Sequence, residues 1–226
     1  MKSLYGTLPQ DLGFININND ESCLCLYMPI KLKNRYHEVL PRHLQKYQRI
    51  LDCVHDDLII GAKSTSGYVD KYIHLTVKAQ FVSGQCTGQR SGWHSDGFMT
   101  DDVNYIYYDS FPTEFYDGSK LKLQLTQDHN KSLDELKKMD VFMRNEIVTF
   151  PEKHLLKLDQ YVIHRPQEYM VPSFRTFVKV SVSDHLYALK GNTINYEPKI
   201  YDVLRNVEYK ERGVERNCPI IGGSGL

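Results

Sequence analysis

A stripe of apolar residues runs through the first third of the chain at helical spacing. Its members are separated by steps of four and three residues: Leu40, Leu44, Tyr47, Leu51, Val54 and Leu58. This spacing is typical of one face of an amphipathic helix, and Pro41 fits the first turn of such a helix. The pattern predicts a helix over 41–58 whose apolar face packs on a sheet.

Other segments are rich in β-branched and aromatic residues, which favours strands. The longest lie at 68–83, 103–109 and 174–183, and the shorter ones lie at 21–30, 121–126, 146–150 and 160–164. In 121–126 three leucines alternate with polar residues. That alternation predicts a strand with one buried face.

A second helix is predicted within the series of strands. Ser132 and Glu135 have the spacing of a capping box, and apolar residues follow at helical spacing: Leu133, Leu136, Met139 and Met143. A long helix followed by many strands with one helical insert predicts an α+β fold, mainly β, with a dominant antiparallel sheet or barrel.

Length and composition are those of an ordinary folded protein. With 226 residues, 41% of them hydrophobic and 25% charged, the chain is expected to form a single domain over 1–226. The segment 192–226 contains two prolines and a glycine-rich end, and we expect it to be a C-terminal extension or an arm of a homodimer. The formal net charge of zero, from 28 basic and 28 acidic residues, argues against binding to extended nucleic acid.

The five cysteines form no CxxC pair, and Cys23 and Cys25 alternate in a predicted strand, as buried thiols do. Residues 1–14 have no apolar core of the length of a signal peptide. No apolar run is long enough to span a membrane. These features predict a reduced, soluble, cytoplasmic protein without a membrane partner.

Two segments, 92–98 (GWHSDGF) and 161–183, carry the most specific chemistry. His94 and Asp96 are two residues apart, so both side chains leave the same face of an extended backbone. His164 ends a short apolar strand. Two imidazoles and one carboxylate form a facial triad that suits Fe(II), because three adjacent coordination positions stay open. We therefore expect these three residues to be catalytic metal ligands.

Arg175 follows His164 by eleven residues, and the two prolines between them fit a turn between adjacent strands. An antiparallel return would bring its guanidinium near the metal. Arginine binds a planar carboxylate through two parallel hydrogen bonds. A metal with an arginine nearby suits a dicarboxylic keto acid, with two oxygens on the iron and the distal carboxylate on Arg175.

This combination resembles the Fe(II)- and 2-oxoglutarate-dependent dioxygenases, whose signature is HxD, a distant histidine and an arginine about one strand later. The matching residues are His94-Ser95-Asp96, His164 and Arg175, and the resemblance covers roughly 65–185. It implies a double-stranded β-helix (jelly roll) flanked by helices, with 65–185 as the catalytic core. It also implies Fe(II), O₂ and the cosubstrate 2-oxoglutarate, hydroxylation of an organic substrate, and release of succinate and CO₂.

The sequence departs from that family pattern at one position. Many members carry Arg-x-Ser, whose hydroxyl also contacts the cosubstrate, whereas here the triplet is Arg175-Thr176-Phe177. The second contact must then come from another residue, for which Thr113, Tyr72 and Gln80 are the candidates. The carboxylate of Asp96 resembles the hydroxylases rather than the halogenating branch, where a halide takes its place.

Two other functions fit the same residues. One is a jelly-roll binding or structural module without turnover, and the other is a cupin-like metal enzyme that does not use 2-oxoglutarate. Arg175 argues against the second, because such an enzyme needs no buried guanidinium there. The substrate stays open between a small molecule, a nucleotide and a peptide side chain.

Overall fold

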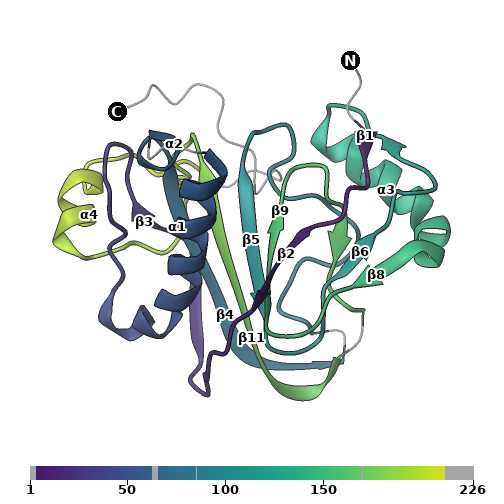
Figure 1. Ribbon diagram of the computed structural model, residues 1–226, viewed down its shortest axis with the longest axis horizontal. Coiled ribbons are helices and arrows are strands. Elements are labelled where there is room, and N and C mark those ends of the chain that lie inside the picture. The colour runs from purple at the N-terminus through teal and green to yellow at the C-terminus, as the bar shows by residue number, and fades with distance from the viewer. Residues whose placement is uncertain (1–3, 63–65, 85, 169, 212–226) are drawn as a thin grey trace.

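Antiparallel sheets make up most of the structure, a computed structural model that describes residues 4–62, 66–84, 86–168 and 170–211 (Figure 1). The large sheet is built from β2 (Gln10–Phe14), β3 (Cys23–Lys31), β4 (Tyr72–Gly84), β5 (Val103–Tyr108), β9 (His154–Leu158) and β11 (Met170–Ser183). Its strand order is β2-β9-β5-β11-β4-β3. The predicted α+β, mainly β, class is confirmed.

A small sheet packs against the large one. Its strands are β6 (Glu114–Tyr116), β8 (Ile147–Thr149) and β10 (His164–Arg165), in the order β10-β6-β8. A separate antiparallel pair joins β1 (Leu4–Tyr5) to β7 (Leu123–Gln124). All strand pairs among the described residues are antiparallel.

Few helices accompany the sheets. They are the 3₁₀ turn η1 (Arg42–Tyr47), α1 (Gln48–Ala62), α2 (Ser66–Val69), α3 (His129–Met143), the 3₁₀ turn η2 (Arg144–Glu146) and α4 (Pro198–Leu204). The predicted helix over 41–58 is therefore present, but it begins as a 3₁₀ turn after Pro41 and runs on to Ala62.

The long strands of the large sheet bury side chains on both faces. On one face, Leu75 and Val77 of β4 and Val178 and Val180 of β11 pack with Leu51 of α1 in one hydrophobic cluster. The apolar stripe of the helix thus covers this sheet, as its spacing predicts. The residues that alternate with these along the same strands point to the other face, toward the small sheet, and line the cavity described below.

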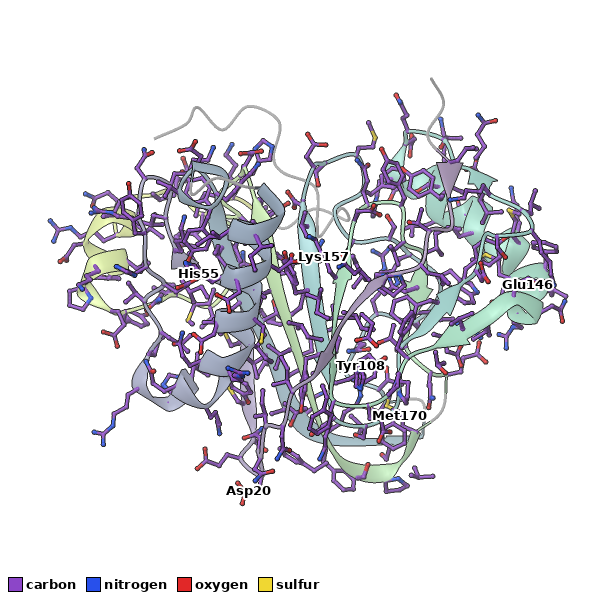
Figure 2. All side chains as sticks on the ribbon, viewed as in Figure 1. Asp20, His55, Tyr108, Glu146, Lys157 and Met170 are labelled. Carbon is purple, nitrogen blue, oxygen red and sulfur yellow. The ribbon has the colours of Figure 1, made fainter. Side chains whose placement is uncertain are left out.

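The space between the sheets holds a second cluster, and a third lies under α3. The inter-sheet cluster, which includes Tyr108 (labelled in Figure 2), consists of Ile106, Tyr108, Phe115, Leu156, Leu158 and Val162. On the outer face of the small sheet, Leu136 and Met143 of α3 pack with Trp93, Tyr116 and Ile163. The helices α1 and α3 therefore lie on opposite sides of the paired sheets (Figure 1).

The cap of α3 differs from the prediction. Asp128 is the N-cap, and its side chain accepts a hydrogen bond from the Lys131 backbone N–H at 3.0 Å. Ser132 lies inside the helix and donates to the His129 carbonyl, while Glu135 accepts from the backbone of Thr126. The N-cap therefore lies four residues before the predicted one, and Asp128 takes the position that the capping box assigned to Ser132; aspartate is an equally favoured cap.

Several shorter elements were absent from the prediction or displaced in it. The strands β1, β2, β6 and β9 were not predicted, and the strands expected at 121–126 and 160–164 are reduced to the two-residue β7 and β10. The expected C-terminal extension is partly packed, because Ile200 and Leu204 of α4 lie against Leu32 and Tyr72. Its remainder, 212–226, lies outside the described residues. Among the described helices, none has the length and apolar character needed to cross a bilayer.

Replacing Leu51 by alanine is expected to lower the free energy of unfolding by about 2–5 kcal/mol, because it opens a cavity between α1 and the large sheet. Ile60 of the same helix is the matched control, since its side chain is 75% exposed. Ile60→Ala should change the free energy by no more than about 0.5 kcal/mol. Urea unfolding measures both, and equal losses would show that α1 does not pack through this stripe.

The buried His74 predicts an acid-sensitive stability. Burial lowers the pKa of His74 to about 3, whereas an unfolded histidine titrates near 6.5. Below about pH 6.5 the unfolded chain therefore binds a proton that the folded chain excludes, so stability falls as the pH falls. The contribution of one such group approaches about 1.4 kcal/mol per pH unit.

The test compares His74→Gln with the unsubstituted protein by urea unfolding between pH 7 and pH 4. The variant should lose less stability over this range, because glutamine does not titrate. Parallel pH curves for the two proteins would contradict the prediction, whatever their absolute stabilities.

Candidate metal centre

Two histidines far apart in the sequence are held side by side by a backbone pair. The His94 N–H donates to the His164 carbonyl at 3.0 Å, and the His164 N–H donates to the His94 carbonyl at 2.9 Å. This antiparallel bridge adds His94 to the open edge of β10. Directly opposite residues in an antiparallel pair leave on the same face, and the two ring centroids lie 4.6 Å apart.

Asp96 reaches the same point from the turn that follows His94. The two alternate residues both line the cavity between the sheets. Gly97 then takes a φ of +69°, and a Cβ built there would lie 3.0 Å from Cβ of Asp102. The turn after Asp96 therefore requires glycine on both conformational and steric grounds.

The three side chains offer a compatible donor set. One ligand atom from each of His94, Asp96 and His164 lies within 4.8 Å of the other two. Nδ1 of His94 lies 2.9 Å from the Gly92 carbonyl, and Nδ1 of His164 lies 3.4 Å from the Val162 carbonyl. These contacts place the proton on Nδ1 and leave both Nε2 atoms as metal donors.

Lys179 of β11 balances the charge of the carboxylate. Its Nζ donates to Oδ2 of Asp96 at 2.9 Å and to the Tyr27 hydroxyl at 2.7 Å. Burial alone would raise the pKa of Asp96, but the Lys179 ammonium and the neighbouring imidazoles hold that pKa well below its usual range. Burial lowers the pKa of His164. The site therefore presents an ionised carboxylate and neutral imidazoles near pH 7.

The triad opens into a cavity of about 340 Å³ between the two sheets. It is lined by residues of β3, β4, β5 and β11, by the triad and by the 88–90 loop. The lining residues outside the triad include Leu24, Leu26, Tyr27, Thr76, Lys78, Gln80, Gln89, Arg90, Ile106, Thr113, Phe177 and Lys179.

The structure places the other predicted site residues at different distances from this cavity. Gln80 and Thr113 line it, and the buried Thr113 hydroxyl has no hydrogen-bond partner among the described residues. Tyr72 packs against α4 in a separate cluster and is absent from the lining.

Arg175 is buried behind the cavity wall. Its Nε and Nη2 donate to the carbonyls of Ser110 and Phe111 at 2.9 and 3.2 Å. It lies on the same face of β11 as Phe177 and Lys179 and pairs in register with Gln80, and all three of these neighbours line the cavity. Four residues separate it from Lys179, which is about 13 Å along a strand.

Arg165 has a structural position, although it adjoins His164. It turns to the outer face of the small sheet, where its guanidinium carbon lies 4.4 Å from the Trp93 ring centroid. Its Nε donates to Glu114 at 2.7 Å and its Nη1 donates to Asp140 of α3 at 2.9 Å. These bonds fasten α3 to the strand that carries His164.

Sequence reasoning missed the basic residues of the cavity: Lys78, Arg90 and Lys179. The sequence did contain an indication of Lys179. It lies between two valines of a predicted buried strand, at an alternate position that shares a face with Arg175. A lysine in that position needs a buried partner, and Asp96 is that partner. Arg90 lies in a loop, where periodicity gives no orientation.

Comparison with protein-family models gives no match, and comparison with curated proteins gives none. Among solved structures, the chain is similar to a bsmA homolog from Methylobium petroleophilum PM1, with 17% sequence identity and a TM-score of 0.36. The match covers 66% of this chain and 56% of that one. The chain thus spans little more than half the length of that protein.

The donor set predicts that Asp96→Ala and His164→Ala each abolish stoichiometric binding of Fe(II), because two remaining ligands do not make a facial triad. Anaerobic equilibrium dialysis followed by metal analysis measures the bound iron. His43→Ala is the matched control, since His43 is an exposed residue of η1. Iron binding by either ligand variant at the level of the control would refute the assignment.

Proposed function

We propose that the protein is an Fe(II)- and 2-oxoglutarate-dependent oxygenase that hydroxylates an organic substrate. The observation that carries the proposal is the convergence of His94, Asp96 and His164 on one cavity wall. A 2-His-1-carboxylate set with open positions is the ligand arrangement of non-haem Fe(II) oxygenases. The resemblance of the sequence to that family points to the same chemistry.

The order of the strands supports a double-stranded β-helix around this site. From β4 onward the chain visits the two sheets alternately: β4, the His94 bridge, β5, β6 with β8, β9, β10 and β11. Two facing sheets filled by alternate turns of the chain are the expected product of a jelly-roll winding. In this arrangement residues 65–185 form the catalytic core.

The residues divide into a metal-holding set and a positioning residue. His94, Asp96 and His164 would hold Fe(II), and the Nδ1 contacts with Gly92 and Val162 fix the ring orientations. Lys179 binds Oδ2 of Asp96, the oxygen that also lies 3.8 Å from Nε2 of His164, and so restrains the carboxylate beside the imidazole. Outer partners of this kind orient metal ligands and tune their basicity.

In this proposal the dicarboxylic keto acid would lie along β11. Lys179 is bonded to Asp96 and so adjoins the ligands, whereas Arg175 lies further along the same face with Phe177 between them. Arg175 is therefore the candidate for the distal carboxylate, and the unpartnered Thr113 hydroxyl is the candidate for the second contact. An unsatisfied buried hydroxyl is costly, so a ligand oxygen there would be stabilising.

Bound Fe(II) would supply the activation of O₂, coupled to decarboxylation of the keto acid to succinate and CO₂. The chain itself supplies an enclosed pocket. Ile106 and Phe177 give the cavity apolar walls next to the ligands, which limits access of water to the reacting atoms. A cytoplasmic location is part of the proposal, and the free thiols of Cys23, Cys25, Cys53 and Cys86 are compatible with it.

The test is release of succinate from 2-oxoglutarate with Fe(II) and O₂, measured by mass spectrometry without added substrate. Arg175→Met should raise the KM for 2-oxoglutarate about tenfold to a hundredfold and leave Fe(II) binding unchanged. That range corresponds to loss of a charged hydrogen bond of about 1.5–3 kcal/mol. Arg35→Met is the control, because Arg35 is exposed.

An unchanged KM in Arg175→Met would refute the cosubstrate anchor. Iron binding by the unsubstituted protein without any succinate release would favour a cupin-like enzyme that needs no keto acid. Absence of both would favour a binding or structural module.

A further inference from the structure

The residues next to the two proposed histidine ligands form a second cross-strand pair. His94 and His164 stand opposite each other in an antiparallel bridge, so the next residues in register are Trp93 and Arg165. Neighbouring residues of an extended backbone point to opposite faces, and this pair therefore lies directly behind the imidazoles. The guanidinium carbon of Arg165 lies 4.4 Å from the centroid of the Trp93 ring, and both side chains are buried.

One carboxylate of α3 binds both members of this pair. Oδ1 of Asp140 accepts a hydrogen bond from Nε1 of Trp93 at 2.8 Å and another from Nη1 of Arg165 at 2.9 Å. Its other oxygen, Oδ2, accepts from Nε of Arg144 at 2.8 Å. Burial would raise the pKa of Asp140, but the bonds from Arg144 and Trp93 hold that pKa below its usual value. Asp140 is therefore an ionised acceptor near pH 7, and charged acceptors form the stronger hydrogen bonds. We call Trp93, Asp140 and Arg165 the outer cluster.

The outer cluster is also bonded to β6. Arg165 pairs in register with Glu114 of that strand, and its Nε donates to Oε2 of Glu114 at 2.7 Å. The guanidinium is thereby held from two sides, by β6 and by α3. The Trp93 ring packs against this fixed guanidinium and shares its acceptor, so its position is fixed as well.

The bridge between the histidines is short and needs such support. Among the described residues, a single backbone bridge joins the two segments, with hydrogen bonds of 3.0 and 2.9 Å between His94 and His164. Besides it, Oγ of Ser95 donates to the Gln160 carbonyl at 2.8 Å. So short a pairing of two strands is not stable by itself in water. Because the outer cluster and the imidazoles lie on opposite faces of the same bridge, contacts that fix the former also fix the spacing of the latter.

We propose that Asp140 is a positioning residue of the metal centre, which acts by fixing the Trp93–Arg165 pair and thereby the separation and orientation of the two imidazoles. The inference rests on the proposed function, because it assigns the imidazoles to a metal. Coupling of this kind is reciprocal, so a metal held by the histidines would strengthen the bonds of Asp140 by the same factor. The helix α3 then belongs to the metal centre, although none of its described residues lines the cavity.

The experiment measures the Fe(II) affinity of the full chain by anaerobic equilibrium dialysis. Asp140→Leu removes the shared acceptor and should weaken Fe(II) binding about tenfold, as loss of outer partners of metal ligands does. Asp140→Asn keeps an oxygen that accepts from both donors, so its affinity should stay within about threefold of the unsubstituted protein. Trp93→Phe removes the Nε1 donor alone and should weaken binding about threefold. Asp134→Leu, at an exposed position of the same helix, is the matched control and should have no effect.

Two further measurements separate positioning from a general loss of stability. With saturating Co(II) in place of Fe(II), the visible absorption of the metal reports the geometry of its ligands. The bands should shift in Asp140→Leu and stay in place in Asp140→Asn. Leu136→Ala loosens the packing of α3 but keeps both bonds of Asp140 Oδ1, so it should lower the stability and leave the Fe(II) affinity unchanged.

Four results would overturn the proposal. The first is Fe(II) binding at the level of the control by Asp140→Leu or, if that variant does not fold, by Trp93→Phe. The second is equal weakening by Leu136→Ala and Asp140→Leu, and the third is an unchanged Co(II) spectrum in Asp140→Leu. The fourth is a loss in Asp140→Asn as large as in Asp140→Leu, which would assign the effect to charge.

The proposed function fails in a different way. Fe(II) binding that depends on Asp140, without succinate release by the unsubstituted protein, would keep the positioning role and reject the oxygenase. Succinate release together with Fe(II) binding that does not depend on Asp140 would keep the oxygenase and reject the positioning role.

Discussion

The two backbone hydrogen bonds between His94 and His164 are the interaction on which the whole site depends. Seventy residues separate these histidines in the sequence, and no other described contact brings their rings together so directly. Once the bridge forms, the two-residue period of an extended backbone carries Asp96 to the same side. Arg165 bonds to Glu114 of the small sheet and to Asp140 of α3. These contacts hold the strand that carries His164 in position to pair with His94.

A single strand, β11, serves both the stability and the chemistry of the protein. Its even-numbered residues Val178 and Val180 belong to the core under α1, and its odd-numbered residues Phe177 and Lys179 line the cavity. Because the parity of a strand cannot change without a bulge, a slip in register would exchange the two sets. The hydrophobic core thus fixes the orientation of the site residues.

The elements that could be predicted from the sequence are those in which apolar and polar residues repeat with a regular spacing. The helix over 41–58, the long strands and the alternation of His94 with Asp96 all follow from repeats of several residues, whereas β6 and β10 are too short to show one. The depth of Arg175 behind Phe177 was not predictable, because it depends on the loop carbonyls of Ser110 and Phe111. The ion pair between Lys179 and Asp96 was likewise not predictable, because it joins residues that are far apart in the sequence.

Trp93 is the single tryptophan of the chain, and it directly precedes one of the proposed ligands. Its ring lies under the Arg165 guanidinium, and its Nε1 donates to Asp140 at 2.8 Å. Indole emission responds to nearby charge and to small movements of its surroundings. The molecule consequently contains an intrinsic optical reporter next to His94, and we expect binding of Fe(II) at the proposed centre to change its emission in solution without any attached label.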